Sequence, residues 1–150
     1  MDKNFYITTP IYYPSARPHM GHAYSSIIAD FFSRFKTIDG YKVCFLTGTD
    51  EHGLKIQRSA EKEGLDPLKF CDQISKTFRD LSKTLNLTNT DFIRTTEDRH
   101  KKTVQHLWKE LEKNDDIYLS NYSGWYSVSD EAFYNEDEIE EIDGKKISIS

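Results

Sequence analysis

The chain has 150 residues, of which 37% are hydrophobic and 13% aromatic, and this is enough apolar material for one domain with a core. Its formal net charge of −5 argues against a general nucleic-acid binder, because such binding depends on clustered cations. No stretch approaches the roughly 20 apolar residues that a membrane helix needs, and Met1 leads into a strand-like segment without a signal-peptide pattern. Cys44 and Cys71 are the only cysteines, so we expect reduced thiols in a cytoplasmic protein that contacts no membrane.

Strand and helix patterns alternate along the first part of the chain, which predicts an α/β fold with a parallel sheet. Aromatic and β-branched residues predict a strand at residues 4–9, which Pro10 ends. A helix is predicted from Gly21 to Ile38, and Asp39-Gly40 closes it. Apolar residues at helical spacing predict one buried face on this helix, formed by Ala23, Tyr24, Ile27, Ile28, Phe31, Phe32, Phe35 and Ile38.

The alternation continues beyond this helix, with strands expected at 41–46 and 92–94 and a helix at 53–64. Asp66-Pro67 predicts the start of another helix, because Asp is a favoured N-cap and Pro a favoured first helical residue. The apolar stripe of that helix is Cys71, Ile74, Phe78, Leu81 and Leu85. A last helix is expected to begin at Thr96 and to carry Val104, Leu107, Trp108 and Leu111.

The pattern changes from helical to β-rich after Asn114. Strands are predicted at 117–119, 122–128 and 146–149, and Asp143-Gly144 is typical of a hairpin turn. We therefore expect a domain boundary near residue 115. Residues 116–150 would be the beginning of a β-rich inserted module, which we expect to continue beyond Ser150.

The first candidate site is the loop that joins the first strand to the first helix. It consists of Tyr12, Tyr13, Pro14, Ser15, Ala16, Arg17, Pro18, His19, Met20, Gly21 and His22. A helix N-terminus presents unpaired N–H groups and the positive end of the helix dipole, which suits phosphate. Gly21 leaves room for a nucleotide, and His19 and His22 can donate hydrogen bonds to phosphate oxygens whose charge grows in a transition state. Either histidine alone is more simply a surface residue, but the Pro-His-Met-Gly-His order favours a nucleotide site.

The second candidate site, Thr47 to Gly53, follows the second strand. The carboxyl ends of neighbouring parallel strands share one crevice, so Asp50 is expected to face the same cavity as Tyr13 and His19. Its carboxylate suits a substrate ammonium group, and an N-cap on the following helix is an equal alternative. A metal site made of Asp50, Glu51 and His52 is a weaker option, because adjacent residues rarely all point at one ion. The chain has neither a P-loop lysine motif nor G-x-G-x-x-G.

These motifs resemble those of a known enzyme family. His19-Met20-Gly21-His22 is similar to the HIGH signature of class I aminoacyl-tRNA synthetases. The wider pattern resembles the methionyl-tRNA synthetases over nearly the whole chain, through Thr8–Tyr13, Phe45–Gly53, Phe92–Thr96 and Gly124–Ser129. The resemblance implies a Rossmann-like catalytic domain, of which residues 1–115 would be the first half, followed by a connective insertion.

The resemblance also implies a role for each site residue. His19 and His22 would bind and stabilise the ATP phosphates, and Gly21 would lie under the adenine. Asp50 would hold the methionine ammonium group, while Ile11 and Tyr13 would line the side-chain pocket. The expected substrates are methionine, ATP as its Mg²⁺ complex, and tRNA(Met). The residues themselves leave the role of His52 open.

Two departures from the family pattern bear on the expected ligands and activity. Many members carry a Cys-x-x-Cys zinc knuckle where this chain has Ser127 and Asp130, so we expect no structural zinc and no other bound metal. The lysine-rich KMSKS loop and the anticodon-reading helical domain of the family are absent from these 150 residues. The interpretation is therefore a methionine–tRNA ligase fragment that we expect to be inactive alone.

Two other functions remain open at this point. A small nucleotidyltransferase could use the same histidine pair, although a pocket of Tyr13 and Asp50 suits an amino acid better. A nucleotide- or RNA-binding remnant without turnover is the non-enzymatic alternative.

Overall fold

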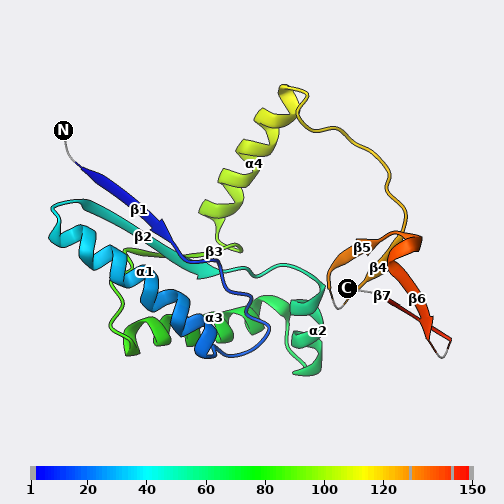
Figure 1. The fold of residues 1–150 in the computed structure, drawn as a ribbon, viewed down its shortest axis with the longest axis horizontal. Helices are drawn as coiled ribbons and strands as arrows, with labels where there is room; N and C mark the ends of the chain where they lie inside the picture. The colour runs from blue at the N-terminus through cyan, green and yellow to red at the C-terminus, as the bar shows by residue number, and fades with distance from the viewer. Residues whose placement is uncertain (1–2, 129, 143, 149–150) are drawn as a thin grey trace. The chain divides into compact units, whose positions relative to one another are not determined.

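The computed structural model describes residues 3–128, 130–142 and 144–148. The chain divides into two compact units, residues 1–105 and residues 106–150. The first unit holds a parallel sheet with helices, and the second holds two small antiparallel hairpins (Figure 1). None of the helices in the described part of the chain is long and apolar enough to cross a membrane.

A three-stranded sheet organises the first unit. Strands β1 (Asn4–Thr8), β2 (Lys42–Thr49) and β3 (Asp91–Arg94) lie in the order β1-β2-β3, and both pairings are parallel. Because all three strands run the same way, their carboxyl ends lie at one edge of the sheet. The prediction of an α/β fold with a Rossmann-like parallel sheet is confirmed.

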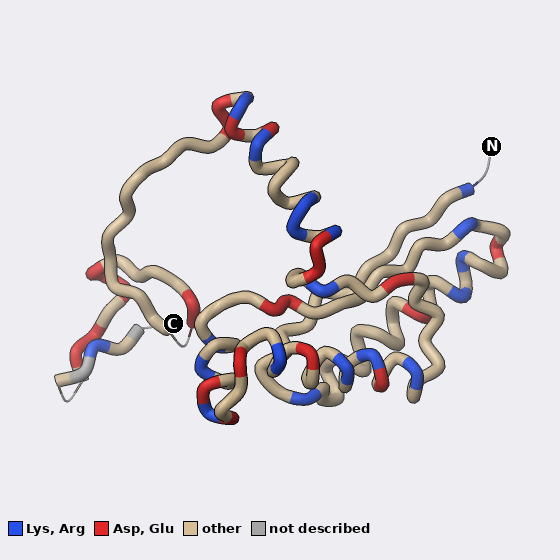
Figure 2. Tube along the Cα trace, turned by 180° about the vertical axis from the view of Figure 1, so that it is seen from behind, with Lys and Arg blue, Asp and Glu red and all other residues tan. Residues whose placement is uncertain are grey.

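Helices connect the strands as the alternation predicted. Helix α1 (Met20–Ile38) joins β1 to β2, and helices α2 (Leu54–Lys62) and α3 (Pro67–Thr84) join β2 to β3 (Figure 1). Helix α4 (Asp98–Lys113) follows β3, and the division between the two units falls within it. The N-cap prediction for α3 is confirmed, since the Asp66 carboxylate accepts hydrogen bonds from two backbone N–H groups of the first turn. Figure 2 shows basic and acidic residues interspersed along α3 and α4.

The core of the first unit lies between the sheet and α3. Phe45 on β2 is completely buried. One cluster consists of Tyr12, Phe78 and Phe92, and another of Ile56, Ala60, Phe70 and Cys71. The predicted stripe of α3 is confirmed, with Cys71 and Phe78 buried and Ile74, Leu81 and Leu85 half-buried. Both cysteines are free thiols, and burial raises the pKa of Cys71 to about 11.

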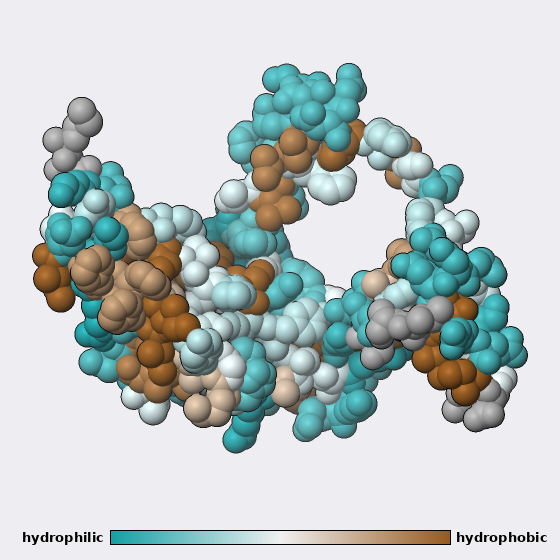
Figure 3. Space-filling model, viewed as in Figure 1, coloured by the Kyte–Doolittle hydropathy of each residue, from teal (hydrophilic) through white to brown (hydrophobic). Residues whose placement is uncertain are grey.

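The predicted buried face of α1 is wrong for most of its residues. The residues of α1 that are buried are small or polar: Ala23, Ser26, Ala29, Asp30 and Ser33. The large apolar residues are between 41% and 87% exposed, namely Tyr24, Ile27, Ile28, Phe31, Phe32, Phe35 and Ile38. Figure 3 shows hydrophobic side chains gathered over this helix. Small side chains let a helix approach a sheet closely, so the periodicity located an apolar stripe but assigned it to the wrong side.

The second unit is built from short antiparallel pairs. Strands β4 (Trp125–Ser127) and β5 (Ala132–Tyr134) form one, and β6 (Ile139–Ile142) and β7 (Lys145–Ser148) form the other, with a 3₁₀ turn at Glu136–Glu138 between them. The hairpin prediction is confirmed by the pairing of residues 142 and 145, although Asp143 itself lies outside the described residues.

The strand predicted at 117–119 is wrong. These residues are irregular, and Tyr118 and Leu119 are 86% and 101% exposed. A β-type residue pattern becomes a strand only when another strand supplies its hydrogen-bond partners, and this segment pairs with none of the strands described. The other predicted strands are present with different ends. The strand predicted at 122–128 is reduced to β4, whereas β2 extends to Thr49 and β3 begins at Asp91. Residue 149 of the last predicted strand lies outside the described part of the chain.

Candidate active site at the carboxyl edge of the sheet

Helix α1 begins at the candidate phosphate site, and His19 is its N-cap. The Nδ1 atom of His19 accepts a hydrogen bond from the backbone N–H of Gly21 at 3.0 Å. The Nδ1 atom of His22 accepts one from the backbone N–H of His19, also at 3.0 Å. The two histidines therefore form a reciprocal cap of the kind that Ser and Glu usually provide.

These hydrogen bonds determine where each imidazole carries its proton. A ring nitrogen that accepts a hydrogen bond is unprotonated, so the proton of a neutral His19 or His22 lies on Nε2. Burial, followed by repulsion from His19, lowers the pKa of His22 below its ordinary value of 6.5. The start of α1 thus offers two Nε2–H donors, and the hydrogen bonds to the Nδ1 atoms fix their orientation.

Tyr12 supports this pair from the sheet side. Its ring contacts that of His22 edge-on, with centroids 4.8 Å apart, and stacks on Phe78 at 5.5 Å. Its hydroxyl hydrogen-bonds to Ser26 at 2.8 Å and lies 3.2 Å from the carbonyl oxygen of His22. The His22 ring is therefore held by the buried Tyr12 and by Phe78, whereas His19 is exposed.

Gly21 is constrained by His19. A Cβ atom at Gly21 would lie 2.9 Å from Cε1 of the His19 ring and 3.1 Å from its Nδ1. A side chain here would displace the imidazole, so the glycine gives space first of all to His19. The predicted role under the adenine remains a prediction.

The loop after β1 runs alongside the end of β2 and joins the two candidate sites. The N–H of Tyr12 donates to the carbonyl of Gly48, and the N–H of Asp50 donates to the carbonyl of Tyr12, both at 2.9 Å. Tyr12 therefore continues the parallel pairing beyond β1, opposite Thr49. Tyr12 therefore lies between the turn that carries Asp50 and the two histidines.

Asp50 does not cap helix α2, so the N-cap alternative is wrong. The N-cap is Gly53, and no side chain caps this helix terminus. The Asp50 side chain instead lies beside Thr95, whose hydroxyl is 3.5 Å from Oδ1 and so at the outer limit of a hydrogen bond. A half-buried carboxylate with so weak an internal contact retains the capacity to bind a cation.

Tyr13 and Ile11 take different positions. Tyr13 is half-buried, and its hydroxyl donates to the carbonyl of His52 at 2.8 Å, which joins the loop after β1 to the turn after β2. Ile11 is 43% exposed. His52 is exposed, and one of its ring nitrogens lies 3.2 Å from the carbonyl oxygen of Thr95, which gives it a part in shaping the turn.

Within the described residues, no group of three or more His, Cys, Asp or Glu is arranged to hold a metal ion. At the position of the family's zinc knuckle, the Ser127 hydroxyl donates to Asp130 Oδ2 at 2.5 Å. The Ser127 hydroxyl and the Asp130 carboxylate are hydrogen-bonded to each other, and both are poor zinc ligands compared with thiolates. The absence of structural zinc stays a prediction.

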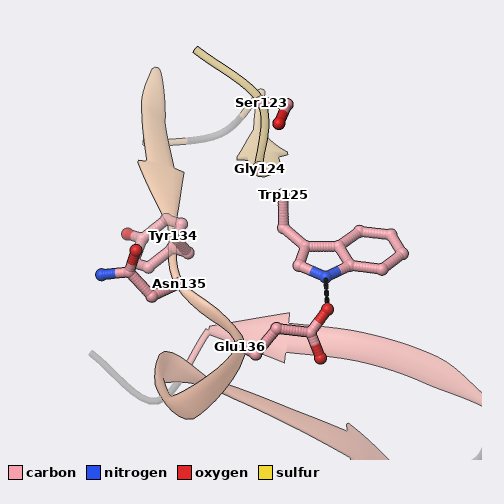
Figure 4. A pocket seen from close by; sticks show the side chains of 6 residues that line it. All are labelled: Ser123, Gly124, Trp125, Tyr134, Asn135 and Glu136. Atoms are coloured by element: carbon pink, nitrogen blue, oxygen red, sulfur yellow. Dashed lines mark hydrogen bonds between the residues drawn. The ribbon is translucent and has the colours of Figure 1, made fainter.

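A pocket in the second unit offers different chemistry. Its volume is about 430 Å³, and the residues that line it are Ser123, Gly124, Trp125, Tyr134, Asn135 and Glu136. Figure 4 shows the Trp125 indole N–H donating to Glu136, at 3.1 Å. Lys146 lies over the same indole ring at 3.7 Å. None of the predicted site residues is among those that line it.

Residues 5–144 match the family model described as tRNA synthetases class I (M). The chain belongs to this family. Among its relatives, the methionine–tRNA ligase of Listeria monocytogenes is 51% identical over 94% of this chain and 21% of the ligase. The mitochondrial methionine–tRNA ligase of Takifugu rubripes is 49% identical over 99% of the chain and 26% of the ligase.

A solved member of the family has the same fold. The methionyl-tRNA synthetase of Mycobacterium tuberculosis bound by methionyl-adenylate superposes with a TM-score of 0.93 at 45% identity, over 98% of this chain and 29% of that one. The predicted resemblance to methionyl-tRNA synthetases is confirmed. The chain spans between about a fifth and three tenths of the length of these family members.

Sequence reasoning missed two residues of this site. The sequence suggests Glu51 only as a metal ligand and Arg94 only as part of a motif, yet they form an ion pair at 2.7 Å directly behind Asp50. Tyr12 belongs to the predicted motif, but the sequence assigns it no role. The position of Glu51 between two polar residues gave no sign of burial, so no sequence signal distinguished it.

Proposed function

We propose that the full-length protein carrying this segment is a methionine–tRNA ligase. It would activate methionine with ATP to give methionyl-adenylate and then transfer the methionyl group to tRNA(Met), in the cytoplasm. The observation that carries the proposal is the pair of Nε2–H donors at the start of α1, next to the Asp50 turn. The homologous structure named for its bound methionyl-adenylate supports it.

In the proposed first step, a carboxylate oxygen of methionine attacks the α-phosphorus of ATP. The new bond is O–P, and the bond to the departing pyrophosphate breaks. Negative charge develops on the phosphate oxygens, and preorganised N–H donors stabilise that charge most when they need not reorient. His19 and His22 meet this requirement, because hydrogen bonds to their Nδ1 atoms already fix both rings. Mg²⁺ would arrive with ATP and bind its phosphates.

Asp50, Tyr13 and Ile11 are the proposed methionine contacts. The Asp50 carboxylate would pair with the substrate ammonium group, which requires a negative charge that the protein has not neutralised. Tyr13 and Ile11 would supply an aromatic and an aliphatic wall, which a polarizable thioether prefers to hydrogen-bond donors. No covalent nucleophile is needed, because positioning and charge stabilisation account for the rate.

We also propose that residues 1–115 form the first half of the catalytic domain and that residues 116–150 begin its connective insertion. The change from a parallel sheet to antiparallel hairpins supports this division. The two compact units divide somewhat earlier, within α4.

Amino-acid-dependent exchange of labelled pyrophosphate into ATP tests the proposal in the full-length protein. We expect exchange with methionine and much less with isoleucine or valine. Exchange that depends on a phosphorylated acceptor in place of an amino acid would favour a small nucleotidyltransferase instead. The absence of exchange with all three amino acids would contradict the proposal.

A further inference from the structure

Glu51 differs from its neighbours in the turn after β2 because its side chain points into the protein. That side chain has no exposed surface. Its Oε1 atom accepts hydrogen bonds from the Thr49 hydroxyl and from Arg94 Nε, both at 2.7 Å. Its Oε2 atom accepts one from the Thr96 hydroxyl at 2.5 Å. A buried carboxylate needs this degree of pairing, because an unpaired buried charge is costly.

Arg94 extends the contact from Glu51 to a third element. It stands at the end of β3, directly opposite Thr49 in the register of β2 and β3. Its Nη2 atom lies 2.7 Å from Oδ1 of Asp72 on α3. The pair of Glu51 and Arg94 therefore joins the ends of β2 and β3 to α3, immediately behind the proposed amino-acid site.

The two strands can meet here because of Gly48. A Cβ atom at Gly48 would lie 2.0 Å from the carbonyl oxygen of Ile93, its partner on β3. Only glycine fits this close approach. The spacing that it allows is the one at which Arg94 reaches Glu51.

A second set of contacts transmits the position of Glu51 to the residues on either side of it. The N–H of Glu51 donates to the Thr95 hydroxyl at 2.8 Å, and the same hydroxyl lies 3.5 Å from Asp50 Oδ1. On the other side, the carbonyl of His52 accepts the hydrogen bond of the Tyr13 hydroxyl. Asp50 and Tyr13 thus both depend on a turn whose central residue is held in the core.

We propose that Glu51 and Arg94 are positioning residues for amino-acid recognition. This inference rests on the proposed function, since it assigns Asp50 to the substrate ammonium. Arg94 compensates the charge of Glu51, so the negative charge that the turn presents to the substrate is that of Asp50. The pair also fixes the Asp50 carboxylate relative to the Tyr13 ring, and this geometry selects an α-amino acid.

The chain contains a matched control for this pair. Asp30 on α1 is also buried, and its carboxylate accepts hydrogen bonds from Arg34 at 2.6 Å and from the backbone and hydroxyl of Thr88. Asp30 is thus another buried acid of the same unit that pairs with an arginine and a threonine. Because Thr88 precedes β3, this pair lies toward the opposite edge of the sheet.

The test uses the full-length protein and pyrophosphate exchange, with methionine and ATP varied separately. We expect Glu51→Gln to raise the KM for methionine about tenfold, because small displacements of a binding group are costly, while the KM for ATP changes less than about twofold. Arg94→Lys keeps the charge but cannot make both contacts, so a smaller rise is expected. Asp30→Asn should lower the melting temperature and leave the KM for methionine unchanged.

A double-mutant cycle separates positioning from general destabilisation. If Glu51 acts through Asp50, then Glu51→Gln should raise the KM for methionine far less in an Asp50→Asn background than in the wild type. The inference would be overturned if the effects of Glu51→Gln and Asp50→Asn on the KM for methionine were fully additive. It would also be overturned if Asp30→Asn raised that KM as much as Glu51→Gln does. Should Glu51→Gln fail to fold, Arg94→Lys is combined with Asp50→Asn in the same cycle.

The outcomes distinguish this inference from the proposed function. Wild-type protein without methionine-dependent exchange would overturn the proposed function and this inference with it. Normal exchange with an unchanged KM for methionine in both Glu51→Gln and Arg94→Lys would overturn the inference alone.

Discussion

The two edges of the parallel sheet use the same kinds of residue for different purposes. Toward the amino edge, Asp30 directs its carboxylate to Arg34 and Thr88, and these contacts join α1 to the segment before β3. At the carboxyl edge, Glu51 is paired in the same manner with Arg94, but the carboxylate of the adjacent Asp50 lies at the longer distance of 3.5 Å from the Thr95 hydroxyl. The Asp30 carboxylate is thus paired within the protein, whereas the Asp50 carboxylate can still bind a cation.

The same contrast applies to the start of α1. A helix usually meets its first N–H groups with Ser, Thr, Asp or Asn, which use small side-chain oxygens for the purpose. Here histidines serve, and each one accepts through Nδ1 while its Nε2–H stays available. An imidazole can cap a helix and still offer an N–H donor. This suggests that the histidines at the start of α1 serve ligand binding in addition to stability.

The largest expected effect comes from removing one of these donors. His19→Ala or His22→Ala in the full-length protein should slow adenylate formation by about a hundred- to a thousandfold, or about 2.7–4 kcal/mol, because a preorganised donor to the developing charge is lost. Single-turnover formation of methionyl-adenylate measures this rate. Near-normal rates in both variants would refute the assignment, and Asp30→Asn serves as the control at the amino edge.

Asp50→Asn should weaken methionine binding by about ten- to a hundredfold, since it removes a charge-assisted contact of about 1.5–3 kcal/mol while keeping the shape of the side chain. ATP affinity should stay nearly unchanged, because the proposed phosphate donors lie at the start of α1. Isothermal calorimetry with each substrate measures both affinities. Unchanged methionine affinity would mean that Asp50 belongs, like Asp30, to the internal structure.

Gly21→Ala should lower the rate of adenylate formation by about tenfold, because its Cβ would press on the His19 ring and displace its donor. Alanine in a helix is also about 0.5–1 kcal/mol more favourable than glycine, so the melting temperature should not fall. Activity and stability are compared on the same preparation. A loss of both together would show a packing defect instead of a displaced imidazole.

The smallest effect is a pH dependence of stability. The pKa of His22 is lowered by burial and then by His19, so the folded chain binds this proton less readily than the unfolded chain does. The contribution of His22 to stability is therefore complete above the unfolded pKa of 6.5, and it is lost as the pH falls below that value through the lower pKa of the folded chain. Urea unfolding from about pH 8 to about pH 5 should show a shallower pH dependence for His22→Gln than for the wild type. Parallel curves would contradict the assigned environment.

Sequence patterns predicted the elements at the carboxyl edge because local rules determine them. Pro-His-Met-Gly-His after a strand predicted the start of α1, and Asp66-Pro67 predicted that of α3. The burial of α1 could not be predicted in this way, because periodicity finds an apolar stripe without showing what packs against it. Ser26, Asp30 and Ser33 face the protein instead.

The partners of Glu51 were equally beyond sequence reasoning. Arg94 and Thr96 lie more than forty positions away along the chain, and only the register of β2 with β3 brings them together. The irregular course of residues 117–119 has a similar cause, since strand formation depends on a partner that the local sequence does not specify.

The position of the substrate relative to these residues can be seen in a crystal structure of the full-length protein with a non-hydrolysable methionyl-adenylate analogue. We expect phosphate oxygens to lie about 2.7–3.1 Å from Nε2 of His19 and of His22, the distance at which such donors act. We also expect the analogue's ammonium group to contact the Asp50 carboxylate, with Glu51 still paired to Arg94. An analogue bound away from the carboxyl edge of the sheet, or an ammonium group held by other residues, would show that these residues do not form the methionyl-adenylate site.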